Sequence, residues 1–264
     1  MSDTTPAVNL EDAEQEVELT PIGDRSRYDP LIETMRNRVT VRKFDPDYVV
    51  PDEHYELILE AARHAPSGAN SQPWQFIIVR DPETKQAISD YFVAEQRFRA
   101  KAKMKFPTPD YRGLATAPGF VIVCSDMRWV NAFPVLNDGS DLDRMYKENA
   151  ERILLQSVAA ATMSAHLAAA ALGYNVWWVT AIGQEEAQAA MRPLLGVPEE
   201  ISVLDIFLFG PAAAKPYKRW RRPLEEIMHY DRYDAEQFMS DEELDEWIKT
   251  RRHRVMFKDA SKVD

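Results

Sequence analysis

Residues 63–76 read RHAPSGANSQPWQF and stand between a helical pattern and an apolar run. Gly68 would allow a positive φ angle, which lets main-chain groups come close to a flat ligand. Asn70 and Gln72 offer hydrogen-bond donors and acceptors together, as the edge of an imide ring requires. The alternative is a turn in which Ser67 and Asn70 satisfy the backbone of the loop itself. The stretch alone leaves both interpretations open.

The pattern on either side of this loop predicts one α+β domain with extended ends. Residues 51 and 52 are Pro and Asp, and Asp52 is expected to cap a helix with a broad apolar stripe. The apolar run from Gly119 to Ser125 predicts a strand that is buried on both faces. By the same arguments, we expect strands near residues 75–81, 119–125, 176–183 and 202–210, and helices near residues 30–38, 52–65, 83–99, 142–172, 185–196 and 242–251.

Composition and charge exclude several classes of partner. The 264 residues carry a formal net charge of -11, which argues against nucleic acid or an anionic membrane. Cys124 is the single cysteine, so no internal disulfide and no Cys-rich metal site can form, and the five histidines lack metal-ligand spacing. The N-terminal stretch does not resemble a signal peptide. We therefore expect a cytoplasmic protein without a metal.

Two basic segments, residues 38–44 and 218–226, lie far apart in this acidic chain. Each has cationic side chains at alternate positions, which would share one side of an extended stretch. Forked guanidinium donors beside a hydroxyl suit a phosphate group. The alternating residues are Arg38, Thr40 and Arg42 in the first segment and Arg219 and Arg221 in the second. Taken singly, each segment could equally be a solvated charged face.

Together the loop and the two basic segments resemble the motifs of the FMN-dependent nitroreductase family. The family pattern R-R-S-V-R-x-F, A-P-S-x-x-N-x-Q-P-W and R-[KR]-P-L-E-E is met here by R-V-T-V-R-K-F, A-P-S-G-A-N-S-Q-P-W and R-R-P-L-E-E. The resemblance covers residues 31–233, and its middle motif is the most specific. Val39 replaces a commoner Arg or His, and Thr40 replaces a commoner Ser while keeping the hydroxyl.

The resemblance implies a central, mostly antiparallel sheet flanked by helices, in an intertwined homodimer that binds FMN across the subunit interface. The chain would then divide into an acidic arm (residues 1–26), an FMN-binding domain (27–233) and a charged helical extension (234–264). The arginines and Thr40 would hold the phosphate and ribityl end, the loop would meet the isoalloxazine, and residues 180–182 would face N5 and O4. The residues implied to bind the cofactor are Arg38, Val39, Thr40, Arg42, Pro66, Ser67, Asn70, Gln72, Thr180, Ala181, Ile182, Arg219 and Arg221.

The implied activity is ping-pong hydride transfer from NADH or NADPH, through the flavin, to a nitroaromatic, a quinone or an activated alkene. Such chemistry needs no acid or base from the protein. Tyr111, Trp129 and Phe133 are candidate substrate contacts, and the alternative is that they pack a lid. Other candidates are a narrower flavin enzyme of this fold, such as a reductive dehalogenase or a dehydrogenase, and a non-catalytic flavin-binding protein. Glu95 is followed by Arg99 where dehalogenase relatives have Tyr, so that substrate clamp is not matched.

Overall fold

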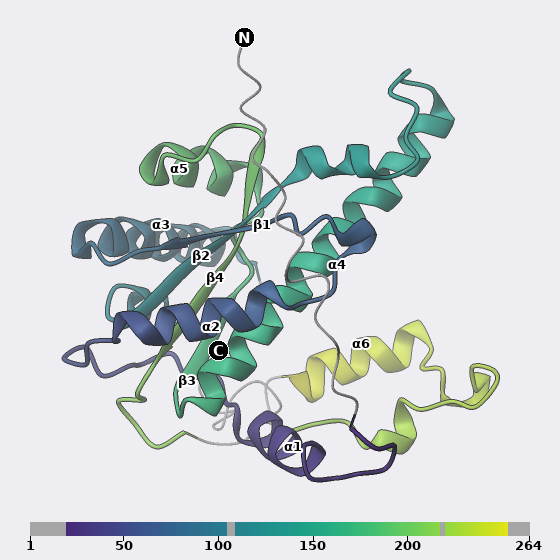
Figure 1. The fold of residues 1–264 in the computed structure, drawn as a ribbon, viewed down its shortest axis with the longest axis horizontal. Helices are drawn as coiled ribbons and strands as arrows, with labels where there is room; N and C mark the ends of the chain where they lie inside the picture. Colours follow the sequence, from purple (N-terminus) through teal and green to yellow (C-terminus); the bar gives the residue numbers. More distant parts are fainter. Residues whose placement is uncertain (1–19, 105–108, 217–219, 253–264) are drawn as a thin grey trace.

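The computed structural model describes residues 20–104, 109–216 and 220–252. Arg219 and most of the expected N-terminal arm lie outside these described residues. At the centre is an antiparallel sheet with the strand order β1–β2–β4–β3 (Figure 1). Its strands are β1 (Trp74–Ile78), β2 (Gly119–Asp126), β3 (Asn175–Val179) and β4 (Ile201–Gly210). The predicted α+β class with an antiparallel sheet is confirmed.

Helices cover both faces of this sheet (Figure 1). One face packs against α2 and α4, and the other packs against α3 and α5. The helices are α1 (Tyr28–Asn37), α2 (Asp52–Arg63), α3 (Pro82–Lys101), α4 (Asp141–Ala171), α5 (Glu185–Leu195) and α6 (Asp241–Thr250). Strand β2 shows why the sheet is buried on two sides: Val121 and Val123 face α2 and α4, whereas Ile122 and Cys124 face α3 and α5.

The predicted cap of α2 is wrong. Pro51 occupies the N-cap position, and no side chain there accepts a backbone hydrogen bond. Asp52 is the first helical residue, where its negative charge interacts favourably with the helix dipole. Its carboxylate also forms an ion pair of 2.6 Å with Arg80, two residues after the end of β1.

Helix α4 runs through the centre of the molecule. It begins where the hydroxyl of Ser140 accepts a hydrogen bond from the amide of Asp143, and it stops before Gly173, whose φ is 89°. Among the described residues it is the one helix whose length and composition would allow it to cross a membrane. Here it packs against α2 and the sheet through Val158, Ala161 and other small or apolar residues.

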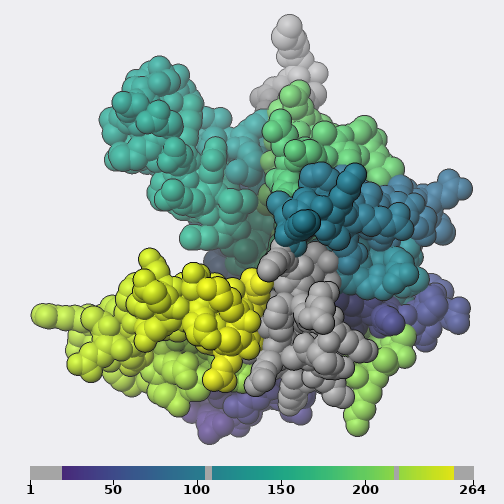
Figure 2. Space-filling model, turned by 180° about the vertical axis from the view of Figure 1, so that it is seen from behind, coloured from purple at the N-terminus to yellow at the C-terminus, as the bar shows by residue number. Residues whose placement is uncertain are grey.

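Two parts project from this body, and Figure 2 shows a broad hollow between them. The first, here named the projecting lobe, is residues 127–150 (teal), and the second, the C-terminal arm, is residues 220–252 (yellow). Both expose large apolar side chains, a property typical of interaction surfaces. These side chains are Trp129, Leu136, Leu142, Met145 and Tyr146 on the lobe, and Trp220, Leu224, Ile227, Met228, Tyr230, Tyr233, Phe238, Met239 and Leu244 on the arm.

Candidate functional site

The first basic segment lies along the edge of the sheet. Thr40 forms a parallel bridge with Val176 of β3, and backbone hydrogen bonds of 3.0 and 3.3 Å flank this bridge. The chain then bends at Arg42, whose guanidinium carbon lies 5.8 Å from the ring centroid of Trp177. Gly113 packs closely against this bend, since a Cβ added to Gly113 would come within 2.1 Å of the carbonyl oxygen of Arg42. The segment is therefore held by both the sheet and a neighbouring turn.

Arg38 and Arg221 approach each other from opposite ends of the domain. Burial and then the nearby positive charge of Arg221 lower the pKa of Arg38. In the described part of the chain, no carboxylate lies within ion-pair distance of either arginine. Two positive charges near each other, with no carboxylate beside them among the described residues, favour the binding of an anion. The contact predicted for Arg219 falls outside the described residues and stays a prediction.

The loop quoted at the outset is attached to α4. The amide of Gly68 donates to Oγ of Ser157 at 3.1 Å, and this hydroxyl donates to the carbonyl oxygen of Ile153 at 2.7 Å. A Cβ at Gly68 would lie 2.2 Å from Cγ2 of Ile153 and 3.1 Å from Cζ of Phe133. Glycine is needed here because the backbone packs directly against two large side chains.

Gly68 does not adopt the positive φ angle that glycine would allow, and three other loop residues adopt one instead. The φ angles are 52° at Ala69, 48° at Asn70 and 45° at Gln72. Such angles are uncommon outside glycine, and they cluster at functional sites. The amide of Gln72 donates to Oγ of Ser67 at 3.1 Å, and its side chain lies 3.3 Å from Oδ1 of Asn70. The loop thus satisfies part of its own backbone, while the Asn70 and Gln72 side chains remain exposed.

The turn after β3 is the third part of the predicted site. Thr180 is exposed, Ala181 is half-buried and Ile182 is fully buried in the core. The side-chain amide of Gln188 fixes the turn by donating to the carbonyl oxygens of Ile182 at 2.9 Å and of Val203 at 2.5 Å. The turn follows β3, the strand whose Val176 pairs with Thr40. At a strand rise of ~3.3 Å per residue, Thr180 lies roughly 13 Å along the chain from Val176.

A single chain brings only some of the predicted residues together. Thr40 pairs with β3, Arg221 lies near Arg38, and residues 180–182 directly follow the far end of β3. The loop instead packs at Ser157, whereas the charge of Arg38 acts on His166, about 13 Å further along the axis of α4. Within a single chain, the loop and the arginines are therefore separate groups.

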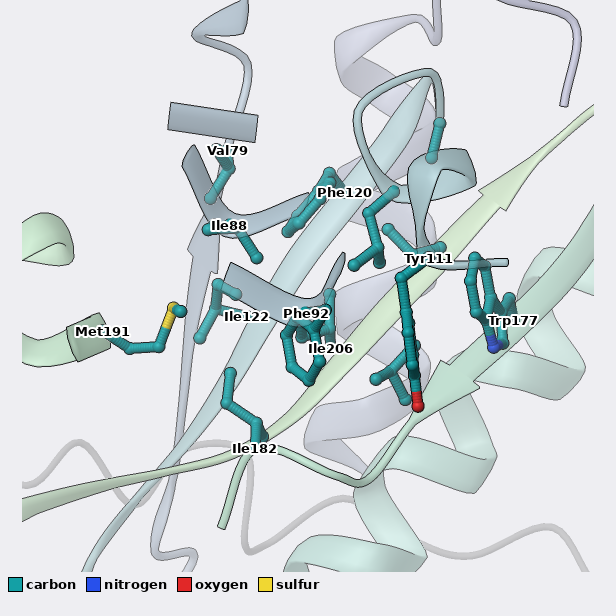
Figure 3. Packing of buried hydrophobic residues seen from close by; sticks show 14 of the residues in the cluster. Val79, Ile88, Phe92, Tyr111, Phe120, Ile122, Trp177, Ile182, Met191 and Ile206 are labelled. Atoms are coloured by element: carbon teal, nitrogen blue, oxygen red, sulfur yellow. The ribbon is translucent and has the colours of Figure 1, made fainter. Parts of the chain in front are cut away.

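The three aromatic substrate candidates occupy different environments. Tyr111 is buried and stacks on Trp177, with ring centroids 6.0 Å apart and an interplanar angle of 15° (Figure 3). Trp129 is exposed on the projecting lobe, and Phe133 is half-buried against Gly68. Tyr111 thus packs the core, whereas Trp129 and Phe133 both belong to the projecting lobe.

Sequence reasoning missed the residue that shapes the lobe. The carboxylate of Asp143 is buried and accepts hydrogen bonds from the amides of Leu136, Asn137 and Gly139 at 3.0, 2.8 and 3.3 Å. The ammonium of Lys147 lies 2.9 Å away. The hydrogen bond from Lys147, with these amides, holds the pKa of Asp143 well below its usual range, at about 2. The one available signal in the sequence was that Asp143 follows the capping residue Ser140 by three positions, the spacing of a capping box.

Other reactive groups offer little alternative chemistry. Cys124 lies inside β2, and burial raises the pKa of its thiol to about 12, so almost no thiolate forms at neutral pH. Among the residues that the structure describes, no group of three or more His, Cys, Asp or Glu side chains is placed to hold a metal ion. The arginine pair, the loop and the turn after β3 remain the candidate site.

Comparison with known proteins places the chain in a family. The Nitroreductase family model matches residues 35–210. An Archaeoglobus fulgidus protein named as an NADH dehydrogenase/NAD(P)H nitroreductase is 32% identical over 164 residues, which cover 62% of this chain and 75% of that relative. Iodotyrosine deiodinase of Nematostella vectensis is 27% identical over 207 residues, covering 74% of this chain and 72% of the relative. The structure of NADPH:FMN oxidoreductase from Vibrio harveyi, complexed with NAD+, has the same fold, with a TM-score of 0.62, 19% identity and coverage of 84% of this chain and 85% of that chain. The chain therefore belongs to the nitroreductase family.

Proposed function

We propose that the protein is an FMN-dependent oxidoreductase that takes hydride from NADH or NADPH and reduces a small electron-poor acceptor. Nitroaromatics, quinones and activated alkenes are the expected acceptors. The observation that carries the proposal is the approach of Arg38 to Arg221 with no described carboxylate beside them. Names of the relatives point the same way, since one is an NAD(P)H nitroreductase and another an NADPH:FMN oxidoreductase. Use of NAD(P)H and a single buried cysteine fit a cytoplasmic enzyme.

The residues at the site fit FMN. A phosphate between Arg38 and Arg221 would replace their mutual repulsion with charge-assisted hydrogen bonds, and the nearby hydroxyl of Thr40 adds a neutral donor. The backbone of residues 180–182, fixed by Gln188, would offer its groups to the edge of the ring. When bound, FMN supplies hydride acceptance and donation at N5, which no protein side chain provides. The task of the protein is to bind and orient the flavin and to shield it from water.

We further propose that a second copy of the chain completes the site. The loop at Ser157 and the arginines near His166 occupy different parts of α4 in one protomer. A two-fold partner that lays its loop against these arginines would assemble all the predicted residues. The apolar side chains of the projecting lobe and the C-terminal arm supply surface for such an assembly.

Similarity to iodotyrosine deiodinase keeps reductive dehalogenation as a second candidate activity. In that case an amino-acid substrate would need free charged groups near the flavin. On α3, however, Glu95 already pairs with Arg99 at 3.4 Å, and both side chains are largely buried. We therefore rank nitroaromatic or quinone reduction first, with a halotyrosine included among the acceptors to be tested.

Anaerobic titration tests the proposed activity. The protein reconstituted with FMN should lose its flavin colour when NADH or NADPH is added and regain it when a nitroaromatic or quinone follows. Recovery only with halotyrosine would favour the dehalogenase candidate. Bleaching by dithionite alone, without turnover of any acceptor, would identify a non-catalytic flavin-binding protein. Failure to bind FMN at all would overturn the proposal.

Arg38→Ala tests the phosphate assignment. The variant should lose about 1.5–3 kcal/mol of FMN binding free energy for each charged hydrogen bond removed, which is roughly a 10-fold to 100-fold weaker Kd. Isothermal titration or flavin fluorescence measures this change. Arg36→Ala is the matched control, because Arg36 is an exposed arginine in the last turn of α1. Equal FMN affinity of the two variants would contradict the assignment.

A further inference from the structure

His166 is a buried polar residue to which the proposed function assigns no role. It lies on α4 with 1% of its surface exposed, and its ring packs 5.2 Å from Trp178 and 4.6 Å from Phe207. Neither ring nitrogen has a hydrogen-bond partner among the described residues. A neutral imidazole carries one donor and one acceptor, and leaving both unsatisfied in a protein interior is unfavourable. Such a group calls for an explanation.

The geometry around His166 leads to Arg38. The segment that follows Arg38 pairs with β3 at Val176, two residues before the Trp178 ring that covers His166. Burial, and then the positive charge of Arg38, lower the pKa of His166 to about 3. The imidazole is therefore uncharged at neutral pH. It adds no third positive charge beside Arg38 and Arg221, and it keeps a lone pair with which to accept a hydrogen bond.

We propose that His166 is a positioning residue for the phosphate group of FMN, acting through Arg38. When the phosphate is bound, a ring nitrogen of His166 accepts a hydrogen bond from the guanidinium of Arg38. This hydrogen bond orients the guanidinium toward the phosphate. The inference rests on the proposed flavin function. A guanidinium has five N–H donors, so it can bind a phosphate with two and still donate to a second acceptor. This second acceptor limits the orientations that the guanidinium can adopt around the bound phosphate.

The proposal differs from a packing role in a measurable way. If His166 only filled space between Trp178 and Phe207, any ring of similar shape would serve equally well for every flavin. If His166 positions Arg38, removing the imidazole should weaken the binding of flavins that carry a phosphate. The binding of riboflavin, which has no phosphate, should stay the same. The ratio of the two affinities therefore separates the two roles without reference to catalytic activity.

Two substitutions make this comparison. His166→Phe keeps an aromatic ring in the slot and removes both nitrogens, whereas His166→Gln keeps a neutral hydrogen-bonding group. Fluorescence titration gives the Kd of FMN and of riboflavin, and thermal melting reports the fold. We expect His166→Phe to weaken FMN binding on the order of tenfold, with riboflavin unchanged, and His166→Gln to recover part of the loss. An equal loss for both flavins, or no loss for FMN, would overturn the proposal.

A double-mutant cycle with Arg38→Ala tests whether the effect passes through Arg38. In that background, His166→Phe should no longer change the Kd of FMN, and an additive loss would contradict the proposed path. Should His166→Phe fail to fold, His166→Leu takes its place in the same cycle. The wild type separates this inference from the function beneath it. If the wild type binds no FMN, both the proposed function and the role of His166 are overturned. If the wild type binds FMN, but the ratio of its FMN affinity to its riboflavin affinity equals that of the folded His166 variants, only the role of His166 is overturned.

Discussion

Gly68 lies so close to α4 that its backbone touches side chains from two other segments. An added Cβ would approach Ile153 to 2.2 Å and Phe133 to 3.1 Å. Gly68→Ala should therefore lower the free energy of unfolding by about 1–3 kcal/mol, the usual cost of overpacking, as measured by urea denaturation. Gly183→Ala is the control, because nothing lies within 4 Å of its Cβ position, and we expect a change within about 0.5 kcal/mol. Equal stability of the two variants would contradict this account of the loop.

The same loop shows how far single residues can be predicted from sequence. Amide side chains and a glycine predict a ligand-facing turn, and the structure does place Asn70 and Gln72 at the surface. Local propensity favours a positive φ at Gly68, yet Ala69 and its neighbours adopt one instead. The contacts that require glycine at position 68 come from Phe133 and Ile153, far along the chain, so the local sequence does not reveal them.

Among the elements, the projecting lobe depends on one buried carboxylate, and its pKa yields a test. Asp143 has its pKa lowered to about 2, so the folded state binds that proton less readily than the unfolded state does. Its stabilisation is then fully present above about pH 4 and is lost as the pH falls toward about 2. Asp143→Asn should unfold at lower urea concentration at neutral pH and lose that part of the acid dependence. Urea midpoints at neutral pH and near pH 3 measure both effects.

Asp141→Asn provides the same chemical change two residues away. The side chain of Asp141 is 92% exposed, and its ion pair with Arg144 lies at the surface. Exposed pairs of this kind contribute little, so this variant should keep both the wild-type midpoint and the wild-type acid dependence. If the two variants behave alike, the hydrogen bonds to Asp143 do not stabilise the lobe.

Regular elements were predictable because their signals are local. The apolar stripe of α2 and the continuous apolar run of β2 locate both elements to within a few residues of Asp52–Arg63 and Gly119–Asp126. Residues 127–140 show no period, and their shape depends on amides captured by a carboxylate of the next helix. A pattern search along the chain does not find such a contact, since its two sides belong to different elements.

For the whole molecule, the candidate site joins segments from opposite ends of the domain. Alternating arginines indicate an anion site in each segment, but only the family resemblance predicted that Arg38 and Arg221 would meet. His166 gave no signal, because a lone histidine in an alanine-rich helix is usually a core residue. Its importance depends on the rings and the charge that the fold places around it.

The proposed homodimer makes the last prediction. Leu155 is 45% exposed on the face of α4 that the sheet leaves uncovered, and half-buried Met163 and Leu167 continue this face. A dimer would bury it, so Leu155→Glu should convert a particle of twice the 30.3 kDa chain mass into a monomer in light scattering. FMN binding should fall with it, because the loop and the arginines would no longer meet. Val49→Glu should leave both unchanged, because Val49 is 83% exposed in the loop that precedes α2. The N-terminal end of α2 lies away from the lobe and the arm (Figure 1). A monomeric wild type would contradict the dimer, and a monomeric Leu155→Glu with wild-type FMN affinity would contradict a site shared between two chains.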